Sequence, residues 1–207
     1  TEVPVDTEVP VDTDSGTDTE QPACNSGSVV ISQIYASGGN AGAVWANDYV
    51  ELHNRSNEDI LLDGWSLQYA TATGGFSKIT ALSGVISAGG YFLIREDSGG
   101  NVGATMSDAD FSGEINLSAT GGKLALIRST VSLADSCTRD DVADLIGYGS
   151  AAICFEGSAP APSPSAVNAA MRVEDGCGES GDNKADFKVA PAVPRTSESN
   201  YQGCVCE

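Results

Sequence analysis

The pattern of apolar and polar positions predicts two short strands near the beginning of the chain. Apolar side chains alternate with polar ones in VVISQIY (29–35) and in DYVELHN (48–54), and both runs are rich in Val, Ile and Tyr. Gly, Asn and Ser bound each run, as they commonly do at strand ends. A period of two is typical of a strand that buries one face, so we expect both strands to be half-buried.

Further short apolar runs follow, and the segments between them are rich in Gly, Ser, Asn and Asp, which favour turns. No window has a convincing helical period over ten or more residues. Seven or more short strands with such turns predict an all-β fold, a β-sandwich. The predicted strands are 28–36, 48–54, 63–70, 76–82, 91–95, 123–129 and 142–148.

Two motifs in this region resemble the lamin-tail domain family. One is Tyr-Val-Glu-Leu-x-Asn at 49–54, and the other is Leu-x-Gly-Trp-x-Leu at 62–67. VADLIGYG (142–149) and the segments after it are similar to the closing elements of bacterial members, and the resemblance covers most of residues 28–198. It implies an immunoglobulin-like β-sandwich of the secreted or surface type, a scaffold without chemistry of its own.

Composition divides the chain into a tail and a body. Residues 1–24 carry seven acids and no base or aromatic residue, so we assign them to an acidic Thr/Pro/Val repeat tail. Residues 25–207 are assigned to the sandwich, with a disulfide-stapled C-terminal extension. The body keeps 22 acids against 10 bases, a net charge of about −12. Such a surface repels phosphate backbones, so nucleic-acid binding is disfavoured.

The sequence favours an extracellular location without a membrane span. No apolar run approaches the roughly 20 residues that a membrane-spanning helix needs. The chain begins with Thr1 and shows neither the charged nor the apolar region of a signal peptide, so we expect any targeting segment to have been removed. We therefore predict a secreted or cell-surface protein.

An even number of cysteines supports this location, because disulfides persist in oxidising compartments. Zinc is disfavoured, since there is no CxxC pair and only one histidine. We expect a Cys137–Cys154 disulfide, because these residues flank the predicted strand 142–148. Cys204 and Cys206 are too close to bond without strain, so each should pair with one of the two remaining cysteines, in an order left open. The six are Cys24, Cys137, Cys154, Cys177, Cys204 and Cys206.

A catalytic site is not expected, and we predict that the protein is not an enzyme. His53 is the only histidine, and it shares a strand face with Glu51. No Gly-x-Ser-x-Gly or comparable nucleophile motif accompanies this pair. We therefore assign His53 a structural or surface role, and we expect Glu51 to accept hydrogen bonds from a neighbouring loop.

Two features suggest binding sites. Asp182, Asn183 and Asp186 form an oxygen-rich turn of the kind that calcium favours, although solvated turn carboxylates are the simpler interpretation. No other cofactor is indicated. Trp45 lies in a Gly/Ala loop, where an exposed ring could contact a ligand such as a glycan, whereas the family resemblance implies that Trp65 belongs to the core.

The tail contains a six-residue repeat, TEVPVDTEVPVDT, over residues 1–13. If the repeat forms a strand, its β-branched residues, including Val3, Val5, Val9 and Val11, share one face, and the acids and prolines share the other. Such a strand suits the edge of a sheet in a neighbouring subunit. A Pro/Thr-rich spacer that tethers the domain to a surface is the alternative.

These features favour a non-catalytic structural protein of the cell exterior that assembles into filaments or layers through its tail. The alternative is an accessory module of a secreted hydrolase that binds a glycan or a protein through Trp45 and the adjacent loops.

Overall fold

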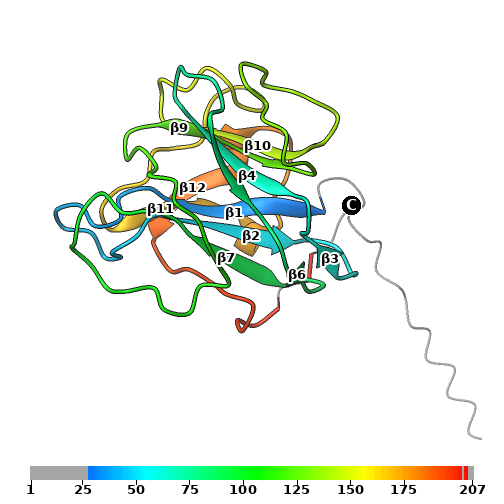
Figure 1. Cartoon of the computed structure of the whole chain (residues 1–207), viewed down its shortest axis with the longest axis horizontal. Helices are drawn as coiled ribbons and strands as arrows, with labels where there is room; N and C mark the ends of the chain where they lie inside the picture. Colours follow the sequence, from blue (N-terminus) through cyan, green and yellow to red (C-terminus); the bar gives the residue numbers. More distant parts are fainter. Residues whose placement is uncertain (1–27, 202, 205–207) are drawn as a thin grey trace, which may run out of the picture.

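The computed structural model describes residues 28–201, 203 and 204. These residues form two stacked sheets and a short two-stranded sheet (Figure 1). In spatial order, the first sheet contains β12 (Phe187–Pro191), β11 (Asn168–Arg172), β1 (Val29–Tyr35), β2 (Tyr49–Asn54), β7 (Tyr91–Arg95) and β8 (Phe111–Ser112). The second contains β10 (Val142–Tyr148), β9 (Gly122–Ile127), β4 (Ser66–Thr71) and β5 (Lys78–Ala81), and β3 (Ile60–Leu61) pairs with β6 (Val85–Ile86).

The fold is an immunoglobulin-like β-sandwich, as the sequence predicts. All strand pairs are antiparallel except β7 with β8. The helical elements of the described chain are two single turns, η1 (Glu174–Gly176) and α1 (Asn183–Asp186). No helix in this part of the chain is long and apolar enough to cross a membrane.

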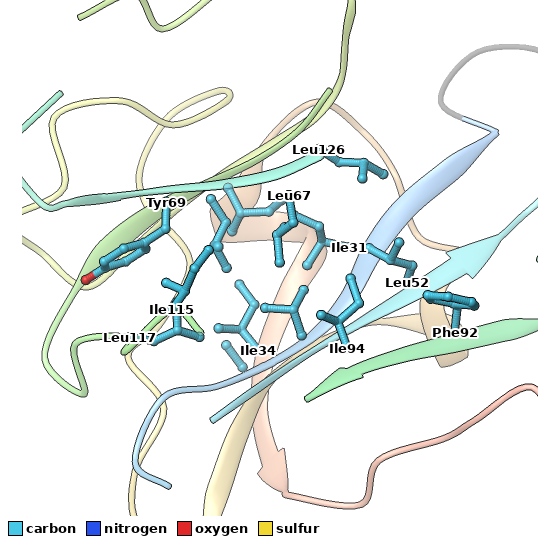
Figure 2. Packing of buried hydrophobic residues seen from close by; sticks show 14 of the residues in the cluster. Ile31, Ile34, Leu52, Leu67, Tyr69, Phe92, Ile94, Ile115, Leu117 and Leu126 are labelled. Atoms are coloured by element: carbon cyan, nitrogen blue, oxygen red, sulfur yellow. The ribbon is translucent and has the colours of Figure 1, made fainter. Parts of the chain in front are cut away.

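Alternating apolar residues from the two sheets meet in the main core. Figure 2 shows Leu67 and Leu126 of the second sheet facing Ile31, Leu52 and Ile94 of the first. All five side chains are fully buried. Each buried aliphatic side chain of this size contributes about 1.5–3 kcal/mol of hydrophobic stabilisation, so this layer holds the two sheets together.

The expectation that β1 and β2 are half-buried is wrong, because every residue of both strands is buried. Their inner faces lie in the main core. The C-terminal segment packs on their outer faces, where Gln33 donates to the carbonyl of Val193. A second apolar cluster on this side contains Tyr35, Tyr49 and Ala192. The C-terminal segment is therefore a third layer over the first sheet.

Two disulfides fix loops at the edges of the sandwich. Cys137 is bonded to Cys154, the pair that the sequence indicates, and this bond links the β9–β10 loop to the segment after β10. Cys177 is bonded to Cys204, so the end of the chain is joined to the residue that follows η1. Cys24 and Cys206 lie outside the described residues.

Candidate functional site

Glu51 is the centre of a buried network on the outer face of β2. Its side chain is fully buried, and it accepts hydrogen bonds from the Arg195 guanidinium (Nη2–Oε1 2.7 Å) and the Arg195 backbone N–H (2.7 Å). Ser32 Oγ donates to Oε1 at 2.6 Å. Burial raises the pKa of the Glu51 carboxyl, and the Arg195 guanidinium opposes that shift. Glu51 therefore binds the C-terminal segment, as expected of a carboxylate that accepts hydrogen bonds from a neighbouring loop.

His53 lies beside this network in a packed, structural position. Its ring is buried and stacks on Tyr91, with 4.5 Å between the ring centroids. The Arg195 guanidinium also stacks on Tyr91, 3.9 Å from the ring centroid. The sulfur of Cys204 is 4.0 Å from His53 Nδ1, but it belongs to a disulfide and has no thiolate to offer a substrate or a metal.

A second buried network joins β1 to β10 and β11. Arg172 is fully buried; its Nε donates to the carbonyl of Ile31 at 2.9 Å, and its Nη2 pairs with Asp144 Oδ2 at 2.8 Å. The same Asp144 oxygen accepts the backbone N–H of Ile31 at 2.6 Å. β1 has a bulge here, since its register with β2 shifts between Ile31 and Gln33. The ion pair thus occupies both backbone groups of Ile31 at the irregular point of the strand.

Three carboxylates converge next to Arg172. Asp144, Glu156 and Glu179 each place one oxygen within 4.8 Å of the other two. Burial and the nearby Asp144 carboxylate raise the pKa of Glu156 to about 8. Within the described chain, this is the group of oxygen ligands closest in geometry to a metal site.

The predicted calcium residues do not converge on a common point. The Asp182 side chain caps α1, where it accepts the N–H of Lys184 at 3.1 Å. Asn183 is buried and bonds to the backbone of Leu145 and Gly147. Asp186 accepts hydrogen bonds from the backbone and hydroxyl of Ser180. This turn is held by protein donors, and the acidic cluster lies beside it.

Trp45 is half-buried rather than exposed. Its indole N–H donates to the carbonyl of Ala192 at 3.0 Å, and the ring packs against the cluster around Tyr35 and Tyr49. Trp65 is partly buried against the main core, and the Arg128 guanidinium lies 5.4 Å from its ring centroid. Trp45 therefore contributes to packing of the C-terminal segment and does not present a free aromatic platform.

An open groove of about 530 Å³ lies next to the edge strand β12. Phe187 and Lys184 line one part of it, and residues 159–162, Ala-Pro-Ala-Pro, line another. β12 is the terminal strand of the first sheet as described. The predicted assembly residues, Val3, Val5, Val9 and Val11, lie outside the described residues.

Comparison with known proteins identifies the family. The family model of the Lamin Tail Domain matches residues 22–150. The chain belongs to the lamin tail domain family. A solved structure of a DUF4876 family protein from Bacteroides thetaiotaomicron VPI-5482 is 12% identical, with a TM-score of 0.45, over 88% of this chain and 72% of that chain. The search of curated proteins found no match.

Sequence reasoning missed the two arginines that organise these networks. Arg172 shares a face of β11 with the buried Ala170, but no strand was predicted there. Arg195 follows a proline in an irregular segment, where no periodicity marks a buried side chain. In the sequence, the available signal is Glu51 between Val50 and Leu52 in the predicted strand 48–54, since a carboxylate that is buried in a strand is rarely unpaired.

Proposed function

We propose that this lamin tail domain is a non-catalytic structural protein of the cell exterior, and that residues 1–13 of one subunit add as a strand to β12 of a neighbouring subunit. The observation that carries the proposal is the position of β12, an edge strand beside an open, largely apolar groove. Edge strands with free backbone groups are the usual acceptors of an added strand.

The side chains of β12 match the two faces of the repeat. Phe187, Val189 and Pro191 alternate along one face, and Phe187 lines the groove. Val189 is 48% exposed, so this face of β12 presents apolar surface to solvent. An added strand would cover this apolar surface with its own β-branched face.

Charge supports the same pairing. Lys188 is exposed on the opposite face of β12, and Lys184 is exposed at the groove. The even positions of the repeat carry acids, including Glu2, Asp6 and Glu8. Because the chain has only 10 basic residues against 29 acids, the exposed Lys188 is a favourable partner for the acidic face of an added strand.

The non-catalytic part of the proposal rests on the side chains that could act in catalysis, because each contacts or bonds to another group of the protein. Glu51 is bound by Arg195, His53 is stacked on Tyr91, and the described cysteines are bonded to one another. The disulfides support an oxidising, extracellular location. The bonds from Arg195 to Glu51 hold the C-terminal segment in place, so this carboxylate serves binding within the protein.

Sedimentation of the full chain tests the assembly. Replacing Val5 and Val9 with Asp should abolish it, because charges would enter the apolar groove. Replacing Glu2 and Glu8 with Gln serves as the matched control, and it should weaken assembly only slightly. Val189→Asp should reproduce the effect of the valine variant from the acceptor side. A monomeric wild-type chain, or equal effects of the two tail variants, would contradict the proposal and favour a spacer.

A further inference from the structure

The cluster of Asp144, Glu156 and Glu179 brings together carboxylates from three segments. Asp144 lies in β10, Glu156 follows the Cys154 disulfide, and Glu179 follows η1. One oxygen from each residue lies within 4.8 Å of the other two. Like charges at this spacing repel one another unless a proton or a cation lies between them.

A buried oxygen of Asp144 provides an independent observation. The Asp144 side chain is 1% exposed, and its Oδ2 accepts both the Ile31 N–H and the Arg172 guanidinium. No protein group donates to the other oxygen, Oδ1, although it is buried. Since Oδ2 already accepts two hydrogen bonds, Oδ1 is the Asp144 oxygen available to a further partner. A buried carboxylate oxygen without a donor is costly, and a bound ion at Oδ1 would remove that cost.

The surrounding charges leave a deficit that a divalent cation would neutralise. Four carboxylates and two arginines interact electrostatically in this region, so the net charge is about −2 when all are ionised. The groups are Asp144, Glu156, Glu179 and Asp186, with Arg55 and Arg172. Arg172 neutralises part of the cluster through Asp144 Oδ2 and Glu179 Oε2. Glu179 Oε1 accepts the Gly181 N–H at 2.8 Å, whereas Asp144 Oδ1 has no donor.

We propose that Asp144, Glu156 and Glu179 bind one calcium ion. All three ligands are carboxylates, and hard oxygen ligands select calcium or magnesium over softer metals. Glu156 and Glu179 are partly exposed and lie in loops, so water molecules can complete the coordination sphere. Calcium tolerates such an irregular set, whereas magnesium requires a near-octahedral one.

The ion would fasten the closing elements of the sandwich to its core. It would link β10 to the segments on either side of β11, all of which lie around Arg172. A ligand that binds only the folded state raises stability with concentration. Calcium should therefore raise the unfolding temperature in a saturable manner, and a chelator should reverse the effect.

Calorimetric titration of the chelator-treated full chain with calcium chloride tests the site. We expect one ion per chain, with a dissociation constant on the order of 10⁻⁴–10⁻³ M, as in other extracellular modules. Glu156→Gln should weaken binding by about tenfold or more. Glu156 is the suitable position because its one protein hydrogen bond through the side chain, from Asn183, is long at 3.4 Å. Glu114→Gln, an exposed change of the same charge, should leave binding unaltered.

NMR chemical shifts of the backbone amides in the wild-type chain provide a measurement that needs no variant. Calcium should move resonances around residues 144, 156 and 179. Absence of saturable binding, equal affinity in Glu156→Gln and wild type, or shifts confined to the acidic tail would overturn the proposal. In the last case, calcium would be screening surface charge only.

Discussion

Replacing Arg195 with Met should destabilise the sandwich by about 3–5 kcal/mol, the usual cost of removing one partner of a buried ion pair. The change deletes the guanidinium donors to Glu51 at 2.7 and 3.1 Å and the stacking on Tyr91. Glu51 has no exposed surface through which water could replace these donors. The free energy of unfolding in urea, measured with the disulfides intact, gives the size of the loss.

Two further variants separate the ion pair from packing. The double variant Glu51→Gln/Arg195→Met should recover most of the loss, because a neutral pair of similar volume leaves no buried charge. Arg128→Met is the matched control, since Arg128 also stacks on an aromatic ring, Trp65, but is exposed. It should change stability little.

The pH dependence of the Arg195→Met variant follows from the same pair. Without the guanidinium, burial raises the pKa of Glu51 further above its unfolded value of about 4.3. The folded variant then retains a proton that the unfolded chain releases, so its stability falls as the pH rises between those two values. The deficit relative to wild type should be larger at about pH 8 than at about pH 5. A loss no larger than that of Arg128→Met, or a double variant no more stable than the single one, would refute the reasoning.

Two other predictions concern different parts of the sandwich. Burial raises the pKa of both Asp48 and Glu96 to about 7. Between about pH 4 and 7 the folded protein therefore holds protons that the unfolded chain releases. The free energy of unfolding should fall by on the order of 3 kcal/mol per group as the pH rises through that window. Carboxyl carbon NMR should give midpoints near 7, and midpoints near 4 would contradict this. Replacing both Cys137 and Cys154 with Ala should lower the free energy of unfolding in urea by about 3 kcal/mol, because the disulfide closes a short loop, with 17 residues of sequence separation. An unchanged urea midpoint would show that the loop is already ordered in the unfolded chain.

The sequence identified the strands whose alternation extends over several residues. The seven predicted ranges correspond to β1, β2, β4, β5, β7, β9 and β10. β3, β6 and β8 were missed because two residues cannot display a period. β11 and β12 were missed because NAAMR and FKVAP contain Ala, Arg and Pro, which do not mark a strand. Pairing with β1 and with each other determines the structure of these two strands.

The candidate sites were harder to predict than the fold, because burial depends on what covers a residue. The alternation in β2 placed Glu51 and His53 on one face correctly, but it could not show that the C-terminal segment covers that face. The sequence suggested calcium at the oxygen-rich turn 182–186, whereas the carboxylates that converge in the structure are Asp144, Glu156 and Glu179. Their separation in sequence leaves no local motif.

The ion pair at the bulge of β1 has a consequence for the order in which the protein folds. Ile31 is bonded to Asp144, 113 residues later, and to Arg172, 141 residues later. A ribosome therefore releases the first central strand long before the side chains that occupy its irregular backbone groups exist, and such distant contacts form slowly. The family match ends at residue 150, before β11 and β12 begin. A chain that ended there would contain most of the strands and Asp144, but the edge of β1 that pairs with β11 would stay open, and the Ile31 carbonyl would lack Arg172.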